Sequence, residues 1–123
     1  MSEPETIVLP LAGRRRESVL RSGAQVVAFH RNELSEILRV YGRQVAAGEW
    51  RDYAIDMLRD RAVFSIFRRA SEIPIYRIEK TPRLARRQGT FAVISATGLI
   101  LKRGHELKTV LRVIDKRVKL AAV

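Results

Sequence analysis

The 123-residue chain contains no cysteine and no long apolar run. The lack of cysteine excludes disulfides, thiolate catalysis and cysteine-ligated metal sites, and it suits a reducing compartment. No apolar run reaches the roughly eighteen residues needed to span a bilayer. The acidic start of the chain, followed by basic residues 14–16, reverses the charge order of a secretory signal. We therefore expect a cytoplasmic protein with no membrane partner.

Catalytic motifs are also scarce. The histidines are His30 and His105, far apart in the sequence, and there is no glycine-rich phosphate loop. Glu106 and Lys108 match the E-x-K half of a metal-dependent nuclease signature. In that signature the residues lie on a strand, whereas here they open an expected helix. We expect a protein that is not an enzyme and that holds no metal ion and no cofactor.

Positive charge, in contrast, is abundant and unevenly distributed. The chain has 24 Lys and Arg against 13 Asp and Glu, a net charge of +11. Residues 81–123 hold ten of these cations against Glu106 and Asp115, a net charge of +8. Such an imbalance favours a polyanionic partner, although some soluble proteins are basic without having one.

The apolar pattern predicts one domain over residues 25–120, preceded by a flexible basic arm at 1–24. Two short runs rich in β-branched and aromatic residues, 62–67 (AVFSIF) and 73–78 (IPIYRI), predict an antiparallel hairpin at the centre of a sheet. Alternation or short apolar runs predict further strands. These lie at 25–29, 50–58, 91–95 and 99–103.

Two segments have helical periodicity. The first, about 32–48, begins with Asn32 as the expected N-cap, has acids in its first turn and stops at Gly48. Gly42 weakens its middle by about 1 kcal/mol relative to Ala, and we expect another backbone to pack closely there. The second, about 105–119, repeats the apolar spacing. The predicted class is α+β, with a mostly antiparallel sheet of five to six short strands covered by two amphipathic helices.

The basic face of the last helix is the first candidate site. Its cations recur at i, i+4, i+8 and i+11 opposite the apolar stripe, interrupted by Asp115, and two more cations precede the helix. A row of Lys and Arg can displace counterions from a phosphate backbone. An ordinary solvated face is the alternative, but such faces usually mix both signs. The residues are Lys102, Arg103, Lys108, Arg112, Lys116 and Lys119.

A second cluster consists of Arg83, Arg86 and Arg87, in an expected flexible loop between Pro82 and Gly89. Guanidinium groups bind phosphates through paired hydrogen bonds, so the loop supports the same interpretation. The aromatic residues fall on predicted core positions or element ends. Binding to the nucleic-acid backbone therefore fits better than stacking on bases.

Two functional hypotheses follow. The leading one is a small non-enzymatic module that contacts the phosphate backbone of DNA or RNA through the C-terminal helix and the 83–87 loop. The alternative is an adaptor or regulator that docks an acidic protein partner, with a homodimer through an exposed sheet edge left open.

The segment AAGEWRDYAIDMLRDRAVFSIFRRASEIPIYRIEK, with LARRQG and LILKRGHEL after it, resembles a family of short bacterial proteins known only as a domain of unknown function. The resemblance covers about residues 29–117. It implies a conserved single-domain bacterial protein. No catalytic residue and no ligand come with it.

Overall fold

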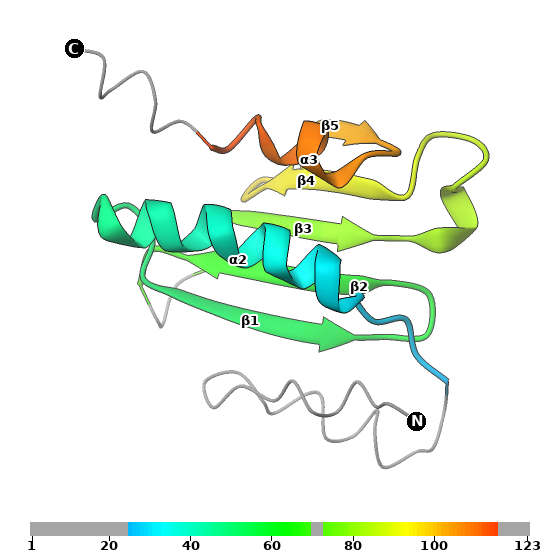
Figure 1. Cartoon of the computed structure of the whole chain (residues 1–123), viewed down its shortest axis with the longest axis horizontal. Coiled ribbons are helices and arrows are strands. Elements are labelled where there is room, and N and C mark those ends of the chain that lie inside the picture. Colours follow the sequence, from blue (N-terminus) through cyan, green and yellow to red (C-terminus); the bar gives the residue numbers. More distant parts are fainter. Residues whose placement is uncertain (1–24, 70–72, 116–123) are drawn as a thin grey trace.

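A five-stranded antiparallel sheet forms the centre of the protein (Figure 1). The computed structural model describes residues 25–69 and 73–115, and the expected arm at 1–24 lies outside this range. The strands follow one another in the sheet in chain order, each antiparallel to the next. They are β1 (Asp52–Met57), β2 (Ala62–Phe67), β3 (Tyr76–Lys80), β4 (Phe91–Ser95) and β5 (Ile100–Gly104).

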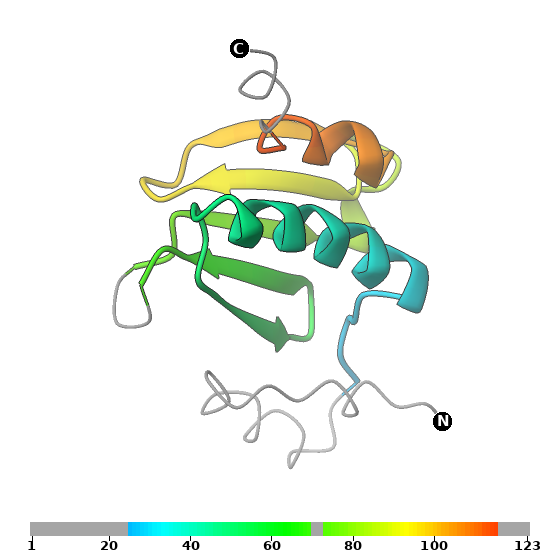
Figure 2. The same cartoon turned by 60° about the vertical axis from the view of Figure 1, so that its left-hand side comes forward.

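Two helices, α2 (Arg31–Ala46) and α3 (Leu107–Leu111), cover the same face of this sheet (Figures 1 and 2). The predicted α+β class is therefore confirmed, with five strands. The core lies between the helices and the sheet. Its largest fully buried side chains come from both helices and from all strands except β5: Phe64, Ile37, Met57, Ile66, Ile78, Val93 and Val110.

The predicted central hairpin is confirmed as β2 and β3. Phe64 of β2 lies opposite Ile78 of β3, and both side chains are buried. Because β2 also pairs with β1, it is an interior strand, and its two faces are buried along nearly its whole length. The strands predicted at 91–95 and 99–103 form a second hairpin, β4 and β5, which turns at Gly98, whose positive φ of 94° favours glycine.

The segment 25–29 is extended, but the predicted strand does not form there. The Val27 N–H donates to the Leu58 carbonyl, just past β1, at 2.8 Å, and the Ala28 carbonyl accepts a hydrogen bond from the Lys80 side chain. Phe29 is buried in the core, and residues 26–28 pack against it. The apolar side chains that suggested a strand therefore pack against the core next to the start of α2.

The structure of α2 differs from the prediction in two details, its N-cap and the surroundings of Gly42. The N-cap is His30, not Asn32, and the Glu33 carboxylate accepts a hydrogen bond from the His30 N–H at 2.7 Å. Gly48 has a φ of 81°, as expected of a glycine just past a helix end. No atom lies within 4 Å of a Cβ placed on Gly42, so the expected close backbone contact is wrong.

The last helix is shorter than predicted. Its apolar stripe is buried, from Leu107 to Ile114, but the α-helix ends at Leu111. Beyond it the backbone continues in tighter turns, with the Ile114 N–H bonded to the Leu111 carbonyl at 3.0 Å. Two β-branched residues there, Val113 and Ile114, favour helix weakly, and Asp115 is bonded to α2 instead. No helix within residues 25–69 and 73–115 is long and apolar enough to cross a membrane.

Candidate nucleic-acid interface

The arginine cluster lies on the connection between β3 and β4, at the right-hand end of Figure 1. We call residues 82–89 the arginine turn. It begins with a short 3-10 helix, Pro82–Leu84, and the Leu84 carbonyl then accepts three N–H groups, from Arg87, Gln88 and Gly89, at 2.9–3.1 Å. The expected flexible loop is therefore a hydrogen-bonded turn that presents its side chains from a defined backbone.

The backbones of two glycines, Gly89 in this turn and Gly104 at the end of β5, lie in close contact. Gly89 has a φ of 110°, and a Cβ placed on it would lie 2.4 Å from the carbonyl carbon of Gly104. Only glycine tolerates such an approach without a backbone shift. The Arg103 side chain adds a hydrogen bond from Nη1 to the Gly89 carbonyl at 3.3 Å. The fold thus brings Arg103, and Lys102 beside it, next to a turn that is distant in sequence.

The cations on the arginine turn and at the end of β5 are not neutralised by carboxylates among the described residues. Arg83, Arg86, Arg87 and Lys102 are all exposed. Among the residues that the structure describes, none of them forms an ion pair with a carboxylate. Arg103 is half-buried and bonds only to a neutral carbonyl. A guanidinium without a carboxylate partner can accept a phosphate without first breaking a salt bridge.

The basic face predicted on the last helix differs from expectation. Lys108 lies 3.8 Å from the Glu36 carboxylate of α2. Asp115, expected to interrupt a basic row, binds Arg43 of α2, with Nη2 to Oδ2 at 2.6 Å and Nε to Oδ1 at 3.4 Å. Arg112 is exposed just past the helix end. Lys116 and Lys119 lie outside the described residues, so the described part of this face contributes only two of the four predicted cations.

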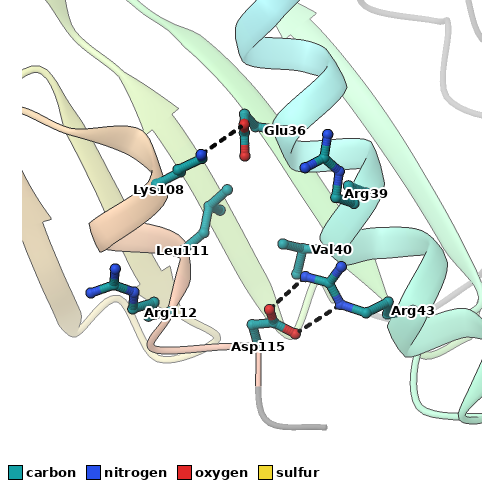
Figure 3. Close-up of a pocket in the computed structure, with 8 residues that line it drawn as sticks. All are labelled: Glu36, Arg39, Val40, Arg43, Lys108, Leu111, Arg112 and Asp115. Atoms are coloured by element: carbon teal, nitrogen blue, oxygen red, sulfur yellow. Dashed lines mark hydrogen bonds and ion pairs between the residues drawn. The ribbon is translucent and has the colours of Figure 1, made fainter. Parts of the chain in front are cut away.

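These ion pairs bracket a pocket of about 210 Å³ between α2 and α3, which we call the helix groove. Figure 3 shows one pair at each end of the groove, while the Arg112 guanidinium points away from α2. Val40 and Leu111 line the groove between the two pairs. The groove therefore contains cations, but two of them are already matched by carboxylates.

Lys80 is a buried cation whose role the sequence interpretation missed. Its side chain is only 8% exposed, and Nζ donates to the Glu33 carboxylate at 2.8 Å and to the Ala28 carbonyl at 2.9 Å. A buried charge must be paired in this way, because its desolvation is costly. Lys80 ties β3 to the start of α2 and is not available to a partner. The alternation of Tyr76, Ile78 and Lys80 was the available signal, because it places Lys80 on the core face.

No exposed ring of the described residues lies beside the arginine turn: Phe91, which follows it at the start of β4, is buried, and the aromatic cluster of Tyr41, Trp50 and Tyr76 lies elsewhere. Trp50 is buried, and its ring centroid lies 6.1 Å from that of Tyr76 at the opposite end of β3. Tyr41 packs edge-on to Tyr53 at 4.8 Å. Burial, and to a smaller extent the nearby Asp52 and Tyr53, raises the pKa of Tyr41 from 10.0 to about 12. These rings form part of the packing under α2 and offer no stacking platform beside the arginines.

Metal ligands are not gathered in the part of the chain that the structure describes. No group of three or more His, Asp or Glu side chains there could hold a metal ion. Glu106 and Lys108 lie at the start of α3, not on a strand, so they lack the context of the nuclease signature.

Comparison with protein families assigns the chain. A family model described as protein of unknown function (DUF2794) matches residues 27–111, most of the chain. The chain belongs to this family. The unknown-function family indicated by the sequence is thereby confirmed. The DUF2794 match runs from the extended segment before α2 to the last residue of α3, so it includes the arginine turn and β5 and leaves out Lys116 and Lys119. No curated protein and no solved structure matches this DUF2794 chain.

Proposed function

We propose that the protein binds the phosphate backbone of a nucleic acid through the arginine turn together with Lys102 and Arg103. The observation that carries the proposal is the set of three exposed arginines, Arg83, Arg86 and Arg87, without a carboxylate partner among the described residues. Lys108 and Arg112 flank this surface as secondary contacts. The proposed function is binding, and it assigns no reaction.

The ordered backbone of the turn supports this proposal. A cation on a mobile loop loses backbone entropy when it binds, whereas the hydrogen bonds to the Leu84 carbonyl already restrict the arginine turn. Each guanidinium can donate two parallel hydrogen bonds to one phosphate. Each phosphate contact also releases counterions, which contributes affinity without sequence preference.

The position of the aromatic side chains favours a duplex over a single strand. Binding to unpaired bases usually relies on exposed rings for stacking. Trp50 is buried, and Tyr76 packs against it away from the turn. We therefore expect contacts to the backbone of a double helix with little sequence preference.

The test compares charge reversals at the two ends of the sheet. The triple variant Arg83→Glu, Arg86→Glu and Arg87→Glu is titrated with a labelled 20-base-pair DNA duplex at several salt concentrations, and fluorescence anisotropy gives the affinity. We expect the slope of log K against log salt to fall by about 2.7, at roughly 0.9 per lost contact. A slope that is unchanged in the triple variant contradicts the proposal.

A matched control separates local contacts from net charge. Arg51→Glu with Arg68→Glu reverses two exposed arginines at the opposite end of the sheet, and Arg86→Glu with Arg87→Glu changes the net charge by the same amount. Arg68 lies 3.9 Å from Glu49, and both side chains are 56% exposed, so its replacement should leave the fold intact. We expect the control to retain most of the binding and the turn variant to lose it.

The adaptor alternative gives a different result in the same assay. Poly-glutamate of comparable charge carries carboxylates in place of phosphates. If it competes for the arginine turn as strongly as the duplex does, an acidic protein becomes the better candidate partner. We expect the duplex to compete more strongly, because phosphates accept paired bonds from three neighbouring guanidinium groups.

A further inference from the structure

The exposed apolar side chains lie at the end of the sheet opposite the arginine turn. The large apolar residues that are exposed in the described part of the chain are Val45, Ile73, Leu99 and Ile100, with exposed fractions of 39, 71, 62 and 50%. Val45 is near the end of α2 and Ile73 follows β2. Ile100 begins β5, and Leu99 directly precedes it. Single exposed apolar residues are common, but two in sequence at the start of an edge strand require an explanation.

β5 is the open edge of the sheet, along the top of Figure 2. It pairs with β4 on one side, and no described residue pairs with its other side. The opposite edge differs, because the segment before α2 bonds beside β1 through the Val27 N–H. An open edge presents a row of unpaired N–H and C=O groups to an incoming strand.

The side chains of β5 define what such a strand must carry. Ile100 lies opposite Ile94 and Arg103 opposite Ala92, on the sheet face away from the helices. Lys102 lies opposite Val93, whose side chain is in the core beneath the helices. Along β5 an incoming strand therefore meets an apolar side chain first and two cations afterwards. Acidic residues opposite those cations would stabilise the pairing, because opposite charges on neighbouring strands attract.

A second copy of β5 fits this edge poorly. Antiparallel self-pairing centred on the middle residue places Lys102 opposite its own copy, and like charges in that position are destabilising. A shift of the centre by one residue instead places Ile100 opposite Lys102 and Leu99 opposite Arg103. A register centred on Ile100 does match apolar residues, because it places Ile100 opposite its own copy and Leu99 opposite Leu101. In all three registers, however, the cations of β5 meet no carboxylate, which an acidic strand would supply.

Leu101 is a bulge, because Val93 and Ile94, consecutive in β4, pair with Lys102 and Ile100. We infer that β5 binds an extended segment of a partner protein as a sixth, antiparallel strand, and that this segment has two consecutive acidic residues followed directly by an apolar residue. The acids lie opposite Arg103 and Lys102, and the apolar side chain lies opposite Ile100. The site shares Lys102 and Arg103 with the proposed nucleic-acid surface, but its apolar part, at Ile100, lies at the other end of β5 from the arginine turn, so the two proposals can fail separately.

The experiment selects binders from a displayed library of randomised nine-residue peptides, with the full chain immobilised. We expect the selected peptides to share the acid, acid, apolar order, with the apolar residue directly after the second acid. A synthetic peptide of the commonest selected sequence should lose at least tenfold in affinity for the Ile100→Asp variant. Val45→Asp is the matched control, because it places the same charge on an exposed apolar residue of α2, and it should change the affinity less than twofold.

Further measurements separate strand docking on β5 from nucleic-acid binding and from self-association. The double variant Arg86→Glu with Arg87→Glu, which should lose nucleic-acid binding, should keep the peptide affinity within twofold. Selection that yields no binder, or peptides that bind the Ile100→Asp variant equally well, overturns the inference. So does a dimer in sedimentation velocity that Ile100→Asp abolishes, because it would show that a second copy occupies the edge.

Discussion

The arginine turn and the helix groove are both rich in cations, yet they differ in how the cations are matched. In the groove, Arg43 binds Asp115 at 2.6 Å and Lys108 faces Glu36 at 3.8 Å, so the charges join α2 to α3. In the turn, the exposed arginines meet no carboxylate among the described residues. Paired cations contribute mainly to the fold, and unpaired ones remain available to a partner. Net charge alone does not distinguish the two.

The largest expected effect concerns the backbone that supports the arginine turn. Gly89→Ala places a Cβ within 2.4 Å of the Gly104 backbone at a φ of 110°. We expect it to lower the free energy of unfolding by about 3 kcal/mol or more, because a steric clash and an unfavourable φ add together. Urea denaturation followed by circular dichroism measures the change.

Gly42→Ala is the control for that substitution. It lies inside α2, and nothing is within 4 Å of the added carbon. Ala is favoured over Gly in a helix, so the variant should gain up to about 1 kcal/mol. Equal effects of the two substitutions would show that the contact between Gly89 and Gly104 does not hold the turn.

A smaller effect separates the paired from the unpaired arginines. Arg43→Ala removes the contact with Asp115 and should lower the free energy of unfolding by about 1 kcal/mol, since that pair is partly buried. Arg86→Ala should change stability by less than about 0.5 kcal/mol, as exposed substitutions usually do. In duplex titrations we expect the opposite order, with the salt slope lowered by about 0.9 for Arg86→Ala only. Equal slopes in the two variants would remove the distinction between turn and groove.

The smallest effect is a dependence of stability on alkaline pH. The pKa of Tyr41 is about 12 in the folded protein against 10.0 for an ordinary tyrosine, so the folded state keeps its proton longer than the unfolded state. The resulting stability is complete below pH 10 and is lost as the pH rises towards 12. Tyr41→Phe should remove this component, and the difference between variant and native denaturation curves at pH 9 and pH 11 measures it. The difference should not change with pH if burial has no influence on Tyr41.

The strand and helix patterns were predictable because they depend on neighbours in the sequence. The short run of β-branched and aromatic residues at β2 and the apolar spacing of the first helix identified these elements, and Gly48 marked the end of the helix. The matching of charges was not predictable. Glu36 and Lys108, or Arg43 and Asp115, are 72 residues apart, and only the packing of α3 beside α2 brings them together.

The same reasoning explains the remaining misses. Lys80 had no role assigned from the sequence, and the strand pairing places it in the interior beside Glu33. Arg103 gained a partner because Gly89 and Gly104 approach each other across the sheet. The three arginines were expected on one connecting loop and lie on the arginine turn, whose defined backbone follows from hydrogen bonds within it that the sequence did not indicate.

Because Gly89 of the arginine turn contacts Gly104 of β5, we expect the binding of a strand to β5 to change the affinity of the arginine turn for nucleic acid. A partner strand that shifts β5 would move Gly104, and Gly89 could not stay where it is. Thermodynamic reciprocity then requires that each ligand change the affinity for the other by the same factor. A small protein built in this way would couple its two proposed partners through this backbone contact and through Lys102 and Arg103, which both partners would contact.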